Sequence, residues 1–259
     1  MLKNTKSVIW SLFKKLDSAL KFPNLKLNEI GIQLGFDMSS SLTSDLFSMQ
    51  KRVGSNGIIY GIDPDISNIN IAQKIISRQK LNIKLIHKAV FSHKGEVELA
   101  LGENSGWNQL NNIPLDSTVK FTQSTVTVPM DSLDNIIEEN EIDIARVSHV
   151  NITINGSEYF ALLGMKKLLE SANNINLTIV AGRYDESGFI DDIPDYEMIM
   201  NFLNSLGYKY KFKRIHQLFW WGVITKLFLN RKWVFGKKNY GIIMASKGNK
   251  KLKWYQSFS

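Results

Sequence analysis

Two patterns of apolar residues alternate along the first third of the chain. Short, nearly continuous apolar runs are typical of strands buried on both faces, and apolar residues spaced three or four apart are typical of helices that bury one face. The runs predict strands over Glu29–Phe36, Ile58–Ile62 and Ile83–His87. The spacing predicts helices between them, over Leu42–Arg52 and Ile66–Gln79. This alternation predicts a parallel sheet with helices on both faces.

The middle of the chain has a different pattern. Gly95–Leu101 alternates apolar and polar residues, which predicts a hairpin arm with one solvated face. A loop is expected over Gly102–Val119, a short strand at Thr125–Val128 and a helix over Asp131–Asn140. The first pattern then returns and predicts a strand at Val147–Ile154, a helix over Glu158–Ser171, a strand at Ile175–Ala181, a helix over Pro194–Leu206, and a final strand pair, Tyr208–Arg214 with Tyr240–Ser246.

These elements suggest one domain over residues 29–246, because neither a repeat nor a clean linker interrupts them. Residues 1–28 precede it and carry one apolar helical face, which predicts a helix that packs on the domain or lies on a membrane surface. Lysines interleave this segment, so we do not expect a secretory signal, and we expect a cytoplasmic protein. An aromatic and basic insertion occupies residues 215–238, and a basic tail occupies residues 247–259.

Charge divides the chain unevenly. The net charge is +8, but Met198–Ser259 holds 13 basic residues and no acidic one. The remaining 19 basic and 24 acidic residues give Met1–Glu197 a net charge of −5. The basic end also holds 14 of the 28 aromatic residues, a combination that favours the boundary of an anionic membrane. We therefore expect residues 208–254 to contact an anionic membrane surface, with nucleic acid as the less favoured partner and a solvated basic edge as the plain alternative.

Composition excludes some chemistry. The chain has no cysteine, which removes disulfides, thiolate metal ligands and a cysteine nucleophile. Four histidines leave little material for a histidine-rich metal centre, so we expect no metal. Catalysis would rest on oxygen and nitrogen side chains and on a cofactor.

A glycine and an acidic residue end the first two predicted strands. In doubly wound sheets the ligand lies across the carboxyl ends of the strands, where a glycine permits close approach and an acid accepts hydrogen bonds from ribose hydroxyls. Gly35 and Asp63 hold these two positions, which indicates a nucleoside-containing cofactor. The alternative is a packing glycine and a simple turn. Neither G-x-G-x-x-G nor a P-loop is present, which weakens dinucleotide and ATP binding.

From about Ile30 to Ser246 the order of motifs resembles the FkbM-type family of S-adenosylmethionine-dependent methyltransferases. The resemblance implies a class I methyltransferase-like, Rossmann-like α/β fold, with a mostly parallel seven-stranded sheet whose last strand is antiparallel. The segments that carry it are IQLGFDMS (Ile32–Ser39), GIIYGIDPD (Gly57–Asp65), NIKLIHKAVFSHKGEVELAL (Asn82–Leu101), VTVPMDSLDNII (Val126–Ile137) and VNITINGSEYFALLGMKKLLE (Val150–Glu170).

The resemblance also implies an activity: methyl transfer from S-adenosyl-L-methionine to a hydroxyl, amide or amine of a small molecule, a glycan or a lipid-linked acceptor. The residues expected to bind the cofactor are Gln33, Gly35, Asp37, Ser39, Asp63 and Ala89. Those expected to contact the acceptor are Asn151, Thr153, Asn155 and Arg183. A hydroxyl acceptor needs a general base, for which Asp37, Glu158 and His216 are candidates by residue type.

Several positions depart from the family pattern. Gln33 stands where the family has an acid, and Ser39 where it has a second glycine. Asn151, Thr153 and Asn155 stand where it has Lys, Asp and Glu, so neutral groups replace a charged constellation. Three alternatives follow: an enzyme with a divergent acceptor, an RNA-binding protein or RNA methyltransferase, and a non-catalytic binding protein.

Three side chains have plain structural alternatives. Arg183 could form a surface ion pair with Asp185 or Glu186, and His216 could pack among aromatic rings. Trp107 could cover the sheet as a hydrophobic plug, or its loop could lie near the adenine or the acceptor.

Overall fold

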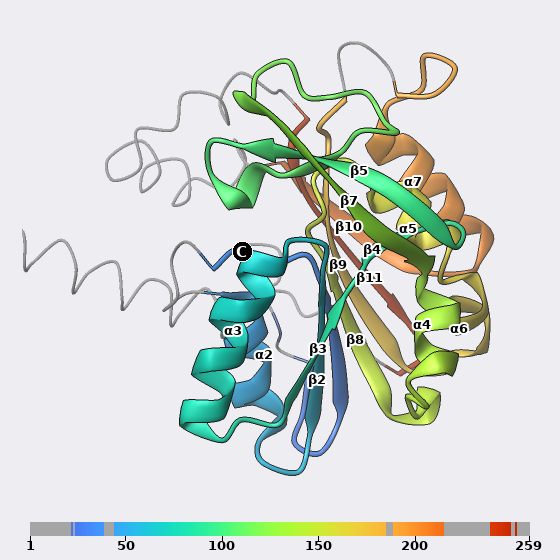
Figure 1. Cartoon of the computed structure of the whole chain (residues 1–259). Helices are drawn as coiled ribbons and strands as arrows, with labels where there is room; N and C mark the ends of the chain where they lie inside the picture. Colours follow the sequence, from blue (N-terminus) through green and yellow to red (C-terminus); the bar gives the residue numbers. More distant parts are fainter. Residues whose placement is uncertain are drawn as a thin grey trace, which may run out of the picture.

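A seven-stranded sheet forms the centre of the computed structural model, which describes Phe22, residues 24–38, 44–184, 189–214 and 239–249, and Leu252 (Figure 1). The strand order is β10–β11–β9–β8–β1–β2–β3. Neighbours are parallel except β11, which is antiparallel to both β9 and β10. The bounds are β1 Ile30–Leu34, β2 Ile58–Asp63, β3 Ile83–His87, β8 Val147–Ile152, β9 Ile175–Ala181, β10 Lys209–Arg214 and β11 Gly241–Lys247. The predicted class I methyltransferase-like sheet with an antiparallel last strand is confirmed.

Helices cover both faces of this sheet (Figure 1). On one face, α2 (Asp45–Val53) and α3 (Ile66–Gln79) bury apolar side chains against β2 and β3. On the other face lie α4 (Leu133–Glu139), α5 (Glu158–Leu163), α6 (Lys166–Ser171) and α7 (Asp195–Ser205). The short 3-10 helix η2 (Ile144–Arg146) leads into β8. None of the described helices is long and apolar enough to cross a bilayer.

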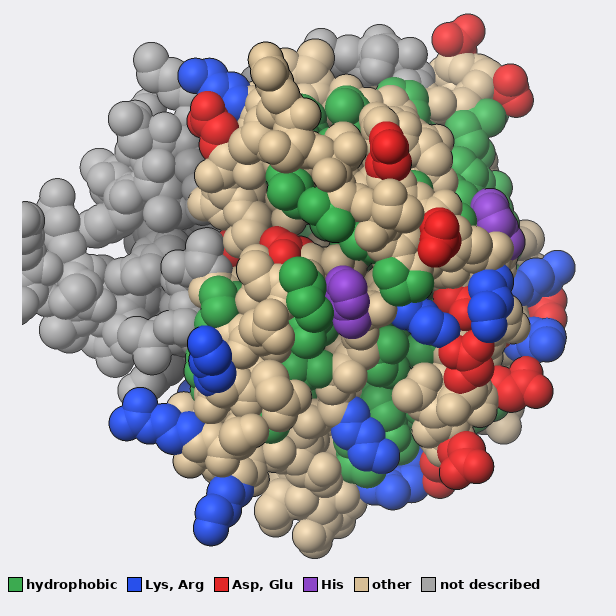
Figure 2. Space-filling view, in the orientation of Figure 1, with side chains coloured by type: hydrophobic (Ala, Val, Ile, Leu, Met, Phe, Trp, Pro, Cys, Tyr) green, Lys and Arg blue, Asp and Glu red, His purple; other side chains and the backbone are tan. Residues whose placement is uncertain are grey.

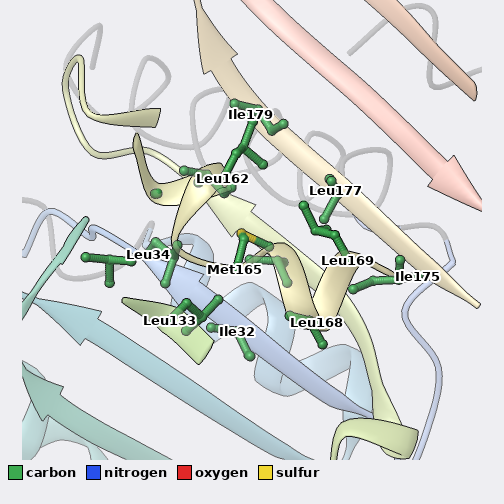
Figure 3. Close-up of a cluster of buried hydrophobic side chains, with 14 of the residues drawn as sticks. Ile32, Leu34, Leu133, Leu162, Met165, Leu168, Leu169, Ile175, Leu177 and Ile179 are labelled. Carbon is green, nitrogen blue, oxygen red and sulfur yellow. The ribbon is translucent and has the colours of Figure 1, made fainter. Parts of the chain in front are cut away.

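The largest apolar cluster lies under α4–α7, where the side chains of β1, β8 and β9 meet those helices (Figure 3). Ile32 and Leu34 alternate with Gln33 along β1, so the apolar pair faces this cluster and the glutamine faces the opposite side. Leu162, Met165 and Leu168 reach the same cluster from α5, the turn after it and α6. Full burial of one such side chain contributes about 1.5–3 kcal/mol.

A second, four-stranded sheet adjoins the first, in the order β4–β7–β5–β6. Its strands are β4 (Ala89–Phe91), β5 (Gly95–Gly102), β6 (Gln109–Leu110) and β7 (Phe121–Ser132). Between β5 and β6 the chain forms the 3-10 helix η1 (Ser105–Trp107). The predicted strand at Thr125–Val128 was too short, because β7 pairs with β5 from Phe121 to Met130. The predicted loop Gly102–Val119 contains η1 and β6.

The single helix predicted over Glu158–Ser171 is wrong, because it breaks into α5 and α6 at Gly164. A side chain at Gly164 would collide with the carbonyl oxygen of Phe91, so β4 passes directly against the break. Asp134 then accepts hydrogen bonds from the backbone N–H groups of Lys167 (2.8 Å) and Leu168 (3.0 Å) at the start of α6. Two tertiary contacts therefore end one helix and begin the next.

Some predictions fall outside the described residues. Almost all of the predicted N-terminal helix, the whole of the insertion 215–238 and most of the tail 247–259 do so. The same is true of Ser39, His216, Asp185 and Glu186.

Candidate functional site

A pocket of about 180 Å³ opens at the carboxyl ends of β1, β2 and β8, the edge at which ligands bind in open parallel sheets. Gly35, Asp63 and Thr153 contribute to it from just beyond these three strands or at their ends, and Ala89 contributes from β4. Among the described residues that line the pocket, the charged side chains are Asp37 and Asp63. The described lining is therefore acidic and neutral.

Gly35 is fixed by backbone geometry. Its φ of 71° lies in the left-handed region, and a side chain there would collide with the carbonyl oxygen of Thr153. The Gly35 N–H donates to the carbonyl oxygen of Ile62 (2.8 Å), which ties the turn after β1 to the end of β2. Glycine at this position therefore lets the backbone turn tightly beside the pocket, and the predicted close approach to a ligand stays a prediction.

Asp63 ends β2 with its carboxylate buried in the wall of the pocket. Its Oδ2 accepts a hydrogen bond from the N–H of Phe36 (2.8 Å), and its Oδ1 accepts from the N–H of Asp65 (2.8 Å) and from Asn68 Nδ2 (3.4 Å). Burial raises the pKa of Asp63 to about 7, although these three donors oppose the shift. An ionised carboxylate has about four acceptor positions, so capacity for one further donor remains.

The loop that contains η1 is tied across the pocket by side chains from both sides. Ser105 Oγ donates to Asp37 Oδ1 (3.1 Å), and Asn108 Nδ2 donates to Asp65 Oδ2 (2.8 Å). From the β8 side, Asn155 Nδ2 donates to the carbonyl oxygens of both Gly106 and Asn108 (2.9 Å each). Ser105, Gly106 and Asn108 line the pocket, so this loop forms part of the wall.

Trp107 belongs to the same loop. It is half-buried and is not among the pocket-lining residues, although its neighbours Gly106 and Asn108 are. The loop therefore lies at the pocket, and its nearness to the adenine or the acceptor stays a prediction.

Next to the pocket, β1, β8 and the residue after β8 share an uncharged set of side chains, which we call the amide network (Gln33, Asn151 and Thr153); Thr153 lines the pocket and the two amides do not. Gln33 and Asn151 are direct partners in the β1–β8 register, and Asn151 Nδ2 donates to Gln33 Oε1 (2.7 Å). Gln33 Nε2 donates to the carbonyl oxygen of Gly35 (2.6 Å) and to Thr153 Oγ1 (3.1 Å). Asn151 also donates to Asp45 at the start of α2 (3.1 Å). The network fixes the turn that carries Gly35.

A second polar set, the arginine network (Arg183, Asp116 and Asn155), lies at the other side. Arg183 and Asp116 form an ion pair of 2.7 Å in which the two side chains are 3% and 1% exposed. The other guanidinium nitrogen donates to Asn155 Oδ1 (2.9 Å), which orients the amide that holds the η1 loop. Arg183 does not lie on the surface, because its guanidinium is buried and bonds to Asp116 from a loop 67 residues away, whereas the suggested partners Asp185 and Glu186 lie outside the described residues.

Glu158 lies beside the arginine network and is 2% exposed. Its Oε1 accepts from the N–H of Ile154 (3.2 Å), and its Oε2 accepts from the N–H of Gly156 (2.8 Å). Burial raises the pKa of Glu158 to about 7, and the nearby charge of Arg183 opposes that shift. These contacts fix the turn between β8 and α5.

The structure separates the predicted site residues into three groups. Those that line the pocket are Gly35, Asp37, Asp63, Ala89, Thr153 and Asn155. Those that lie behind its described lining are Gln33, Asn151, Glu158 and Arg183. Ser39 and His216 lie outside the described residues. The structure assigns no role in binding or catalysis to any of them, so those roles stay predictions.

Sequence reasoning missed several residues of the pocket. Asn68 lies one turn into α3 and faces Asp63, five residues earlier, which is a signal that the spacing could have given. Ser105, Asn108 and Ser157 also line the pocket. Their polar side chains stand in turns, where such residues are common, and nothing in the sequence distinguishes them. In the described part of the chain, no three acidic or histidine side chains form a group that could hold a metal ion.

Comparison with known proteins gives one family. The model of the methyltransferase FkbM domain matches residues 30–210. No curated protein sequence matches the chain.

Several solved structures are similar to the chain at low identity. Fibrillarin from Aeropyrum pernix, crystallised with natively bound S-adenosyl-L-methionine, is 11% identical with a TM-score of 0.46, covering 90% of this chain and 73% of that one. An rRNA methylase from Streptococcus thermophilus is 9% identical with a TM-score of 0.47, covering 90% and 95%. Precorrin-6y C5,15-methyltransferase from Geobacter metallireducens is 8% identical with a TM-score of 0.45, covering 91% and 87%.

Proposed function

The chain belongs to the FkbM methyltransferase family, and from this premise we propose that it transfers a methyl group from S-adenosyl-L-methionine to a hydroxyl of a small molecule or glycan. S-adenosyl-L-methionine is the cofactor of this family. The observation that carries the proposal is the pairing of Gly35 and Asp63 in one pocket at the carboxyl ends of β1 and β2. A tight glycine turn and an acid at the end of the next strand suit a nucleoside.

The residues of this pocket fit that cofactor. Asp63 lines the pocket and retains capacity for one donor, such as a ribose hydroxyl. Pro64, Ala89 and Val90 supply apolar wall on which a base can pack. Asp37 adds a carboxylate near Gly35, which suits the positive charge of a sulfonium or an amino group.

The chain's own residues have a limited chemical task. When bound, S-adenosyl-L-methionine supplies a methyl group on an electrophilic sulfonium, so the protein mainly has to position the acceptor in line with it. A hydroxyl acceptor must also lose its proton as the new C–O bond forms. We assign this proton to Asp37, because its carboxylate lines the pocket, whereas Glu158 is not among the lining residues.

The described wall favours an uncharged acceptor. Its charged members are two aspartates, and none of its described residues is Lys, Arg or His. Phosphate-rich acceptors such as RNA would meet like charge there. This supports a neutral hydroxyl compound over the RNA-directed alternative.

Membrane docking through residues 208–254 is a separate part of the proposal. In the described part of that segment, the edge strand β10 exposes Lys209 and Lys211 on one face and Tyr210 on the other. Exposed basic and aromatic side chains suit an anionic lipid surface. Figure 2 shows basic and acidic side chains close together over part of one face. Separately, Lys88 and Lys94 form ion pairs with Glu139 of α4. Sedimentation with anionic liposomes tests the docking, and no sedimentation at low salt would exclude it.

A non-catalytic binding protein remains the second candidate, because the amide network replaces charges that the family has at Gln33, Asn151 and Thr153. It predicts that S-adenosyl-L-methionine binds but that no labelled methyl group reaches hydroxyl acceptors such as simple sugars. Methyl transfer to any such acceptor would exclude it.

Calorimetric titration with S-adenosyl-L-homocysteine tests the main proposal. We expect one binding site per chain in the unmodified protein and at least a tenfold loss of affinity in Asp63→Ala, because the ribose would lose its acceptor. Asp143→Ala is the matched control, since that aspartate caps η2 (3.1 Å to the Ala145 N–H) and does not line the pocket. Absence of binding to the unmodified protein would reject the proposed function.

A further inference from the structure

A second cavity, which we call the amino-edge cavity, opens at the amino ends of β1, β8 and β9. It is lined by residues 26, 28 and 29 before β1, residues 145–148 where η2 meets β8, Asn174 before β9, and Asn249 after β11. Its volume is about 440 Å³, far more than the roughly 10–15 Å³ that one water molecule needs. It shares no lining residue with the candidate pocket at the carboxyl ends, so it is a separate candidate site.

Two cationic side chains line this cavity and retain unused donors. Arg146 Nη2 donates to the carbonyl oxygens of Asn28 (2.7 Å) and Asn56 (3.3 Å), which holds the guanidinium in place. A guanidinium has five N–H donors, so those on Nε and Nη1 remain available. The ammonium of Lys26 forms no hydrogen bond or ion pair in the described structure, which leaves its three donors available as well.

The protein itself already uses acceptors of the lining. Asn174 Oδ1 accepts from the N–H of Asn249 (2.7 Å), which joins the start of β9 to the turn after β11. Glu29 Oε2 accepts from the N–H of Lys26 (2.7 Å) and from Ser148 Oγ (2.7 Å). Glu29 is the one acidic residue among the described lining residues, against two basic ones. The capacity that remains is therefore mainly that of donors, in a lining of net positive charge.

We propose that the amino-edge cavity binds a phosphate group, supplied by a lipid headgroup or by free phosphate. A phosphate group presents acceptor oxygens and negative charge, and arginine and lysine side chains are its usual partners in proteins. Arg146 and Lys26 supply the charge, and the amide Nδ2 of Asn174 supplies a neutral donor. No residue of the candidate pocket takes part, so the inference goes beyond the proposed function and does not depend on it.

Three variants allow a matched test. Asn174→Asp keeps an acceptor for the N–H of Asn249 but adds a negative charge to the lining, so phosphate affinity should fall at least tenfold with little change in the melting temperature of the free protein. Lys26→Gln should weaken binding about 2- to 5-fold, because its ammonium is exposed and partly screened by solvent. Lys74→Gln is the control, since it lowers the net charge by the same amount on an exposed position of α3, outside the cavity.

Two probes distinguish the sources of the phosphate group, each applied to the full chain and the three variants. Inorganic phosphate is titrated while sodium chloride keeps the ionic strength constant, and the rise in melting temperature gives the affinity. Sedimentation with vesicles of phosphatidylcholine, with and without phosphatidylglycerol, measures binding to headgroups.

A rise in melting temperature with phosphate that Asn174→Asp abolishes and Lys74→Gln retains supports a site for free phosphate. Sedimentation with phosphatidylglycerol vesicles that shows the same dependence, without a response to inorganic phosphate, supports a lipid headgroup as the source. Equal responses in Asn174→Asp and Lys74→Gln, or no response of the unmodified protein to either probe, would overturn the inference.

Discussion

The amide network and the arginine network fix neighbouring parts of the same pocket by different means. In the first, Gln33, Asn151 and Thr153 connect β1 to β8 with neutral hydrogen bonds. In the second, a buried ion pair between Arg183 and Asp116 orients Asn155. Neutral pairs cost little to bury, whereas a buried ion pair depends on both partners being present.

The comparison also shows that two departures from the family pattern lie next to each other. The resemblance implies an acid where this chain has Gln33 and a lysine where it has Asn151. Those positions are direct partners across β1 and β8, and here their side chains hydrogen-bond at 2.7 Å. Complementary uncharged amides therefore join β1 to β8 at this point.

Breaking the arginine network should have the largest effect. Arg183→Met would leave the carboxylate of Asp116 buried without its counter-charge, and we expect a loss of about 3–5 kcal/mol in the free energy of unfolding. Guanidinium chloride denaturation measures this loss. The double variant Arg183→Met/Asp116→Asn should lose less than the sum of the single variants. Additive losses would show that the two side chains do not stabilise the fold as a pair.

Restoring one charge to the amide network should have the next largest effect. Gln33→Asp would bury a carboxylate near Asp45 and remove the donor to the Gly35 carbonyl oxygen, and we expect a loss of about 2–3 kcal/mol. Adding Asn151→Lys should recover part of it, since opposite charges would then face each other in the register. Guanidinium chloride denaturation measures the free energy of unfolding of the single and the double variant. A further loss in the double variant would show that positions 33 and 151 do not act as a pair.

The pH dependence of stability should be a smaller effect than these two losses. It should distinguish Glu158, which lies beside the arginine network, from the amide network, whose members do not titrate. Burial raises the pKa of Glu158 to about 7, above its value in the unfolded chain, so its contribution is present below about pH 4 and is lost as the pH rises through 7. We expect the free energy of unfolding to fall between pH 5.5 and 7 by on the order of 1–2 kcal/mol from this carboxyl.

Thermal melts between pH 5.5 and 7 measure this fall in stability, and Glu158→Gln should reduce the slope of stability against pH. Asp63, whose pKa is also raised to about 7 by burial, would contribute the slope that remains. Gln33→Leu in the amide network serves as the control, because glutamine does not titrate there. An unchanged slope in Glu158→Gln would contradict the assignment.

Local patterns predicted most of the fold. The strands β3 and β9 and the helix α3 have the predicted bounds, because the strands are short runs rich in apolar residues and α3 is a long periodic segment. Sequence reasoning failed where a tertiary contact decides the outcome. The break at Gly164 depends on the carbonyl oxygen of Phe91, and the length of β7 depends on pairing with β5.

The residues of the candidate site also divide into those that a local pattern predicts and those that depend on a tertiary contact. Gly35 and Asp63 could be predicted because they stand at strand ends, where local pattern and topology coincide. Asp116 could not, since its partner Arg183 lies 67 residues further along the chain and no periodicity relates the two. Arg183 was expected at the acceptor because it follows the strand Ile175–Ala181, and the packed structure shows in addition that its guanidinium contacts Asp116 and Asn155.

The anchoring of Asp63 has a thermodynamic consequence. Three donors hold its carboxylate before any ligand arrives, so the rotamer entropy of that side chain is lost during folding and not during binding. A ribose that meets this rigid acceptor gains its hydrogen bond without ordering the protein group that provides it. Removal of one donor, for example the Asn68 amide, would leave the Asp63 side chain more mobile in the free protein. Its rotamer entropy would then be lost on binding, and association would become entropically less favourable.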